Sequence, residues 1–71
     1  MGDAMKTEWQ SMDKTPRPWV RIVLRAASDG LEYYGLTYCR HRGAIIEPIT
    51  NQEALPVLGP CDGWRYDERD L

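Results

Sequence analysis

The 71-residue chain contains no phenylalanine, a single histidine and only two cysteines. Without phenylalanine, other large side chains must fill the interior, so we expect Trp19 and Trp64 to be buried. The sequence leaves the position of Trp9 open. Two cysteines allow at most one disulfide, and because no signal peptide begins the chain, we expect a cytoplasmic protein with reduced thiols.

Long hydrophobic runs are also missing. The longest, Ile22–Leu24 and Ala44–Ile46, are far shorter than the roughly 20 residues of a membrane-spanning helix, so no membrane association is expected. The length fits a single small domain, close to the size at which one hydrophobic core is just sufficient. We expect residues 1–9 to form a flexible N-terminal tail and residues 10–71 to form this domain.

The formal net charge is only −2, but the charges are unevenly distributed. Acidic and basic residues balance up to Tyr38, Arg40 and Arg42 then add positive charge, and the part from Glu47 onward is acidic. An acidic C-terminal third suits contact with a basic protein partner, or simply solubility. Direct nucleic-acid binding is disfavoured, because nucleic-acid-binding domains usually carry a net basic surface.

The pattern along residues 19–38 predicts an antiparallel β-hairpin. Hydrophobic residues alternate from Val20 to Ala26, Ser28–Gly30 has turn chemistry, and an aromatic, strand-like pattern follows. We therefore expect strands at residues 19–27 and 31–38, with Gly35 leaving room for a bulge or a close neighbour. The side chains expected to face the core are Val20, Ile22, Leu24, Ala26, Tyr34, Leu36 and Tyr38. Those expected on the opposite face are Arg21, Val23, Arg25, Tyr33 and Thr37.

The rest of the chain predicts short elements only. Ala44–Ile46 has the pattern of a third strand, and both Val57–Leu58 and Trp64–Tyr66 could pair briefly with the sheet. Thr50 and Glu53 have the spacing of a capping box, so a helix is expected near residues 50–55. Pro56 should limit this helix to about one turn. The predicted fold class is α+β, mostly antiparallel β, with a small sheet built on the hairpin and at most one short helix.

Three residues are candidate metal ligands. Cys39, His41 and Cys61 could bind zinc, with Asp62 or water as the fourth ligand, although the spacing differs from that of common zinc fingers. The alternative is two small, buried thiols and a partly exposed histidine. Nucleophilic catalysis would need a thiolate activated by His41 together with an orienting acid, and no such acid can be identified. We therefore predict a protein that is not an enzyme and has no cofactor, with a zinc-binding module as the alternative.

Two segments between residues 38 and 67 carry a resemblance to a metalloprotein family. They are Cys39-Arg-His41-Arg-Gly43 and Gly59-Pro-Cys61-Asp62-Gly63-Trp64-Arg-Tyr66-Asp67. Together they resemble the two ligand loops of a Rieske iron–sulfur domain, in which two cysteines and two histidines hold the cluster. Here Gly59 and Asp62 occupy the places of the second cysteine and the second histidine. The resemblance therefore implies the loop architecture of that family without its cluster or its redox chemistry.

The N-terminal half carries a second resemblance. Residues 9–16 read Trp-Gln-Ser-Met-Asp-Lys-Thr-Pro, the expected strand follows, and Gly63-Trp64-Arg-Tyr66 is a matching later segment. This arrangement resembles a loose group of small phage and prophage proteins that open with Trp-Gln-x-[Met/Ile]-[Asp/Glu]-x-x-Pro. The resemblance implies a virus-encoded accessory protein in the host cytoplasm. Small domains of this kind commonly bind a large host enzyme, frequently RNA polymerase, and block or redirect it.

The sequence as a whole thus predicts a non-enzymatic, phage-type regulatory protein that binds a host protein machine. RNA polymerase is the preferred partner, and the expected effect is on transcription. Arginine and aromatic side chains dominate the energetic centres of protein interfaces. The predicted contact residues on the open hairpin face are Arg21, Arg25, Tyr33, Arg40 and Arg42. The acidic residues Asp67, Glu68 and Asp70 are the alternative contact surface.

Overall fold

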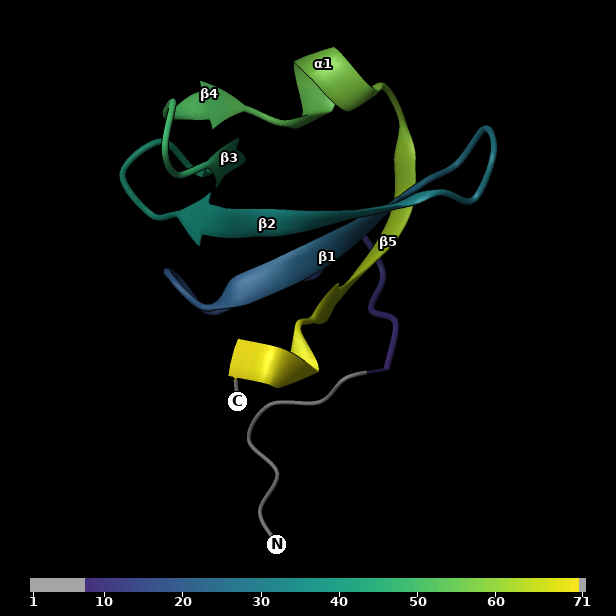
Figure 1. The fold of residues 1–71 in the computed structure, drawn as a ribbon, viewed down its shortest axis with the longest axis horizontal. Coiled ribbons are helices and arrows are strands. Elements are labelled where there is room, and N and C mark those ends of the chain that lie inside the picture. Colours follow the sequence, from purple (N-terminus) through teal and green to yellow (C-terminus); the bar gives the residue numbers. More distant parts are fainter. Residues whose placement is uncertain (1–7, 71) are drawn as a thin grey trace, which may run out of the picture.

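A computed structural model of the protein describes residues 8–70. Within them the chain forms one five-stranded antiparallel sheet with the strand order β4-β3-β2-β1-β5 (Figure 1). The strands are β1 (Arg21–Ala26), β2 (Glu32–Cys39), β3 (Ala44–Glu47), β4 (Gln52–Glu53) and β5 (Cys61–Tyr66). A one-turn helix, α1 (Leu55–Leu58), joins β4 to β5, and a 3-10 turn, η1 (Glu68–Asp70), follows β5. The predicted fold class, a mostly antiparallel β-sheet with one short helix, is confirmed.

The central strand β1 is the most deeply buried element. It pairs with β2 on one side and with β5 on the other, and Ile22, Val23 and Leu24 have no exposed surface. Ile22 and Leu24 face the hydrophobic core, which also contains Leu36, Ile45, Ala54 and Trp64. Because side chains alternate along a strand, Val23 lies on the opposite side of the sheet. We call this side the outer face.

A β-bulge at Gly35 exchanges the roles of two neighbouring tyrosines. Ile22 pairs with Leu36 but Leu24 pairs with Tyr33, so β2 has one extra residue here, and Gly35 has a φ of 79°. Such a positive φ is readily adopted by glycine alone. The extra residue turns Tyr33 towards the core, where it packs, and leaves Tyr34 48% exposed. The expected bulge is therefore confirmed, but the predicted orientations of Tyr33 and Tyr34 are wrong.

The helix lies later in the chain than the capping-box pattern predicted. Thr50 does not bond to Glu53; its backbone N–H and hydroxyl instead donate to Glu47 Oε1, each at 2.9 Å, and close the turn between β3 and β4. Residues 52–53 then form β4, and Pro56 stands in the first turn of α1, where a missing N–H costs nothing. The expected strand pairing of Val57–Leu58 is also wrong, because both residues belong to α1.

The tryptophans take three different positions. Trp64 is 3% exposed and belongs to the core, as predicted, and Trp9 is half-buried. Trp19 is 58% exposed, so its predicted burial is wrong. Its φ of 67° directs the chain away from the strand path just before β1 begins, and this turn carries the side chain out of the core. Thr37 was expected on the outer face as a surface residue, but it is 3% exposed and its hydroxyl donates to the Val20 carbonyl.

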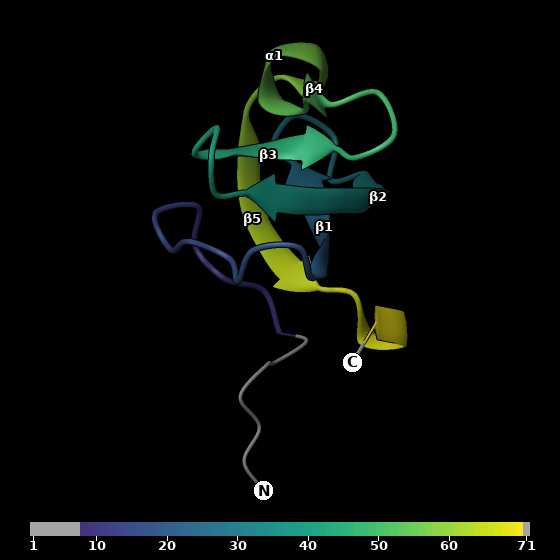
Figure 2. The same cartoon turned by 90° about the vertical axis from the view of Figure 1, so that its left-hand side faces the viewer.

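An N-terminal strap, residues 8–17, contacts β5, and its first bend projects away from the sheet (Figure 2). Gln10 and Trp64 exchange two backbone hydrogen bonds as an isolated antiparallel bridge. The indole N–H of Trp64 donates to the Lys14 carbonyl at 2.9 Å, and the Arg17 amide donates to the Tyr66 hydroxyl at 2.9 Å. The strap is therefore part of the folded domain from Glu8 onward. Most of the expected flexible tail, residues 1–7, lies outside the described residues.

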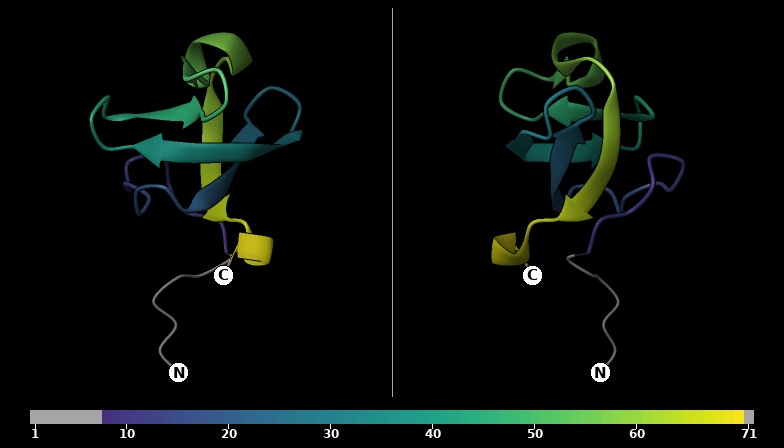
Figure 3. Two further views of the ribbon diagram at one scale, coloured as in Figure 1. Left: turned by 60° about the vertical axis from the view of Figure 1, so that its left-hand side comes forward. Right: turned by 90° about the vertical axis from the view of Figure 1, so that its right-hand side faces the viewer.

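The turns of the sheet lie on two opposite sides of the molecule (Figure 3). The turn between β2 and β3, residues 40–43, lies on the same side as the first bend of the strap. The turn between β1 and β2, residues 27–31, lies on the other side. Within residues 8–70, no helix is long and apolar enough to cross a membrane.

Candidate interaction face

The five predicted contact residues do not form one patch. Arg25 lies on the outer face, and Arg21 begins the same strand at an exposed position. Tyr33 packs against the core on the other side of the sheet. Arg40 and Arg42 lie in the turn between β2 and β3, and Arg42 points to the far edge of the sheet, where it donates to the Asn51 carbonyl and to Glu53. The structure thus keeps Arg21 and Arg25 on the face that the sequence predicted, since alternation along β1 puts both on the side of Val23, and it places the other three elsewhere.

Three arginines and two aromatic rings form a continuous stack across the outer face. We call it the arginine–aromatic stack; its members in spatial order are Arg69, Tyr34, Arg65, Trp9 and Arg25. The guanidinium carbon of Arg69 lies 5.0 Å from the Tyr34 ring centroid, and that of Arg65 lies 5.7 Å from the same ring. Arg65 is also 5.2 Å from the Trp9 centroid, and Arg25 completes the stack at 4.4 Å from Trp9. All four distances are within the range of attractive cation–π contacts.

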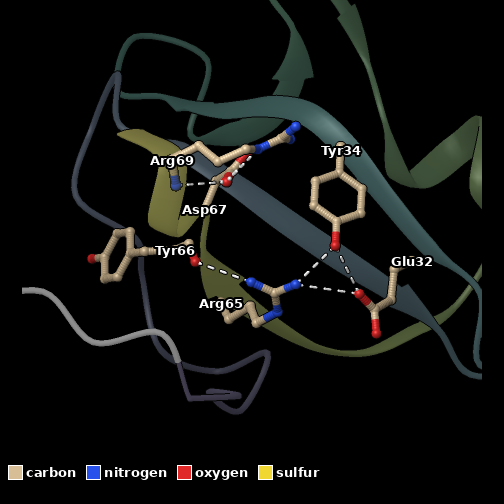
Figure 4. Close-up of polar contacts among 6 residues, drawn as sticks. All are labelled: Glu32, Tyr34, Arg65, Tyr66, Asp67 and Arg69. Atoms are coloured by element: carbon tan, nitrogen blue, oxygen red, sulfur yellow. Dashed lines mark hydrogen bonds and ion pairs between the residues drawn. The ribbon is translucent and has the colours of Figure 1, made fainter. Parts of the chain in front are cut away.

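Each arginine of the stack also has a carboxylate partner. Figure 4 shows those of Arg65 and Arg69. The Arg65 Nη2 group donates to the Tyr34 hydroxyl at 2.9 Å and to Glu32 Oε1 at 3.3 Å, and the Tyr34 hydroxyl donates to the same Glu32 oxygen at 3.1 Å. Arg25 Nε donates to Asp62 Oδ1 at 2.8 Å. The three positive charges are therefore matched by nearby acids, and hydrogen bonds fix the orientation of the side chains.

Asp67 anchors the end of the stack. Its side chain is 4% exposed and accepts hydrogen bonds from Arg69 Nε, Arg69 Nη2 and the Arg69 backbone N–H. These hydrogen bonds from Arg69 hold the pKa of the Asp67 carboxyl below its usual value, against the opposing effect of burial. The same contact raises the pKa of Arg69. Asp67 thus binds Arg69 inside the protein and is not available as the acidic contact residue that the sequence suggested; Glu68 is exposed.

The candidate metal ligands are not brought together. Cys39 is buried at the end of β2 and pairs with Ala44, whereas Cys61 begins β5 and pairs with Ala26 at the far end of β1. At about 3.3 Å per residue, the length of β1 separates the two thiols by roughly 20 Å. Among the described residues, no group of three histidine, cysteine, aspartate or glutamate side chains could hold a metal ion. The cysteines of the two segments compared with Rieske ligand loops therefore lie at opposite ends of β1.

The Cys61 thiol has the opposite character to an activated nucleophile. Both cysteines are free, and His41 is exposed in the turn after Cys39. Burial, and to a smaller extent the negative charge of Asp62, raises the pKa of the Cys61 thiol. Reactive cysteines need the opposite shift, since the thiolate is the attacking species.

Comparisons with known proteins add no relative. No family model matches the chain, and neither the curated proteins nor the solved structures contain a significant match. The structure does bring together residues 9–16, which belong to the strap, and residues 63–66 of β5. They are joined through the Gln10–Trp64 bridge and the Trp64–Lys14 hydrogen bond.

Proposed function

We propose that this protein is a non-enzymatic regulatory domain that binds a host protein machine and inhibits or redirects it. The observation that carries the proposal is the arginine–aromatic stack on the outer face. Tryptophan, tyrosine and arginine are the residues most enriched at the energetic centres of protein interfaces. Here they are gathered on one face of a small sheet, with the Arg69 and Tyr34 side chains exposed to a partner.

The stack is suited to binding because its side chains are already ordered. The Arg65 side chain donates hydrogen bonds to Glu32, to the Tyr34 hydroxyl and to the Tyr66 carbonyl besides lying between two rings, and it is only 16% exposed. Fixing a flexible side chain in an interface costs roughly 0.5–1.5 kcal/mol, and a side chain that is ordered beforehand avoids most of this cost. Between Tyr34 and Arg69 the face also has a hollow of about 230 Å³, which a partner side chain could enter.

The preferred partner is bacterial RNA polymerase, and this choice comes from the resemblance to small phage proteins. In support, the residues that carry the resemblance have clear places in the fold. Trp9 contributes a ring to the stack, and Gln10 joins the strap to β5. Pro16 is buried and Met12 packs against the core. The pattern therefore describes how the strap docks and positions Trp9 in the proposed contact face.

A direct binding measurement tests the proposal. The immobilised domain is exposed to purified bacterial RNA polymerase, and transcription from a standard template is measured with and without the domain. We expect saturable binding and a change in transcript yield. A double variant, Arg25→Ala with Tyr34→Ala, should bind at least about tenfold more weakly, since residues at interface centres often contribute 2 kcal/mol or more.

The control variant is Ile49→Ser, which changes an exposed residue in the turn between β3 and β4 away from the stack and should bind normally. Circular dichroism and thermal melting establish that both variants are folded. Absence of polymerase binding by the wild-type domain would remove RNA polymerase as the partner. If affinity purification from bacterial lysate also recovered no protein above background, the whole proposal would be wrong.

A further inference from the structure

The opposite side of the sheet contains an apolar groove beside helix α1. It has a volume of about 340 Å³ and lies between the bulged part of β2 and the segment from β4 to α1. Tyr33, Leu36, Ala54 and Leu58, which belong to the core or pack against it, line this groove. The volume is near the lower end of the range of about 300–1,000 Å³ for small-ligand pockets, so the groove suits side chains of a peptide segment better than a large cofactor.

Helix α1 adds exposed apolar surface to the groove. All four of its residues are apolar, including Pro56, yet none of them is buried. Val57 and Leu58 line the groove; Val57 is 64% exposed and Leu58 is half-buried. Because the apolar side chains of this single helical turn remain exposed to water, they contribute little to the free energy of folding. Burial against a partner would remove this apolar area from solvent and is favourable at about 25 cal/mol per Å².

The rim of the groove is acidic. Glu47 and Glu53 both line it. Hydrogen bonds from the Thr50 and Ile49 backbone amides lower the pKa of Glu47, so its carboxylate is charged at neutral pH. Among the described ion pairs none involves Glu47, and Glu53 has a single contact with Arg42 at 3.3 Å, in which both side chains are about 40% exposed. An ion pair this exposed is weak and can be exchanged for another cation.

We infer that the groove binds a segment of a partner protein in which one or two large apolar side chains stand next to a lysine or arginine. The apolar side chains would occupy the space between Tyr33 and Val57, and the cation would lie against Glu47. The inference does not depend on the outer face, since the groove opens on the other side of the sheet. Tyr34, at the bulge, is the residue that lines the groove and also belongs to the stack.

Two synthetic peptides of equal length test the inference. One alternates leucine with lysine and the other alternates leucine with glutamate; each is titrated into the ¹⁵N-labelled full-length domain and followed by NMR. We expect the lysine peptide to shift the amide signals of Ala54, Val57 and Leu58. The glutamate peptide should bind at least about tenfold more weakly, because like charges would face each other at the rim.

Matched variants distinguish binding in the groove from nonspecific hydrophobic binding. Val57→Ser should weaken binding of the lysine peptide several-fold, whereas Ile49→Ser should leave it unchanged, although Ile49 is the more exposed residue at 91%. Glu47→Gln should reduce the preference for the lysine peptide over the glutamate peptide. Equal binding of both peptides, equal effects of Val57→Ser and Ile49→Ser, or amide shifts outside the groove would each overturn the inference. The double variant of Arg25 and Tyr34 is uninformative here because Tyr34 is shared, so Arg25→Ala alone is used to show that the stack is not needed.

Discussion

Trp19 combines a left-handed backbone conformation with a largely exposed tryptophan side chain. A φ of 67° is uncommon for any residue with a Cβ atom and is unusual for one as bulky as tryptophan. The Trp19 N–H donates to the Tyr38 carbonyl at 3.2 Å, which extends the pairing of β1 with β2 by one step. This hydrogen bond therefore helps to hold the Trp19 backbone at a positive φ, which residues with a Cβ atom disfavour. The indole of Trp19 remains largely exposed to solvent.

Glycine at position 19 should consequently be better for stability than alanine. The variants Trp19→Gly and Trp19→Ala remove the same indole, but only glycine relieves the left-handed backbone, so Trp19→Gly should be more stable by about 1 kcal/mol. Urea denaturation of both variants measures the difference. Ala27→Gly is the control at an exposed site without a positive φ, and there glycine should be the less stable residue. If glycine were the more stable residue at both positions, or alanine at both, the proposed backbone strain at Trp19 would be contradicted.

Asp67 should make stability depend on pH in the acid range. Its pKa is lower in the folded protein than in the unfolded chain, so its contribution is complete above pH of about 4 and is lost as the pH falls through the folded value. Asp67→Asn should lower the free energy of unfolding at pH 7 by about 1–2 kcal/mol, since charged hydrogen bonds are lost. The difference between wild type and variant should shrink as the pH approaches 2.

Denaturation at a series of pH values measures this difference, and Glu68→Gln is the control. Glu68 is exposed and adjacent in sequence, so its substitution should change stability little at any pH. If the difference in unfolding free energy between wild type and Asp67→Asn did not change with pH, the pKa of Asp67 would not be lowered by its contacts with Arg69.

At the scale of elements, the strap depends on the absence of a side chain at Gly63. A Cβ atom there would lie 3.1 Å from the Gln10 carbonyl oxygen and 3.6 Å from the Trp9 ring. Gly63→Ala should therefore loosen the strap from β5, and the Trp64 amide, which donates to the Gln10 carbonyl, should exchange with solvent at least about tenfold faster through local opening.

Gly35→Ala provides the contrast in the same hydrogen-exchange measurement. A Cβ atom on Gly35 would have no neighbour within 4 Å, but the φ of 79° would be strained. This substitution should lower overall stability by about 1–2 kcal/mol through the backbone alone. Unchanged protection of the Trp64 amide in Gly63→Ala would show that the strap tolerates the added methyl group.

The elements with a strong local pattern could be predicted from the sequence. The alternation from Val20 to Ala26 places β1 correctly, and Gly35 marks the bulge. The same bulge defeats the assignment of faces, because one extra residue reverses the orientation of Tyr33 and Tyr34, and alternation alone does not reveal on which side of the glycine the change occurs. The strand β4 has only two residues, too few for a periodic pattern, and the strap depends on long-range hydrogen bonds to Trp64 and Tyr66.

At the scale of the whole molecule, only part of the candidate interaction face could be predicted. Arg25 and Tyr34 belong to the hairpin, but Trp9 comes from the strap, Arg65 from β5 and Arg69 from η1. Their proximity depends on the pairing of β5 with β1 across nearly 40 residues of sequence, which local patterns do not contain. The sequence does contain a chemical signal, because arginine, tyrosine and tryptophan are enriched at the centres of protein interfaces. The fold gathers these residues on one side of the sheet.

The Gln10–Trp64 bridge has a further consequence for how the domain can meet other proteins. The strap covers part of the outer edge of β5, and the opposite edge of the sheet is the two-residue strand β4. Neither border offers a long row of unsatisfied amides and carbonyls on which a foreign chain could lengthen the sheet. A protein that bound the described part of the domain would therefore meet one of its two faces, where side-chain chemistry and not backbone complementarity would decide the fit.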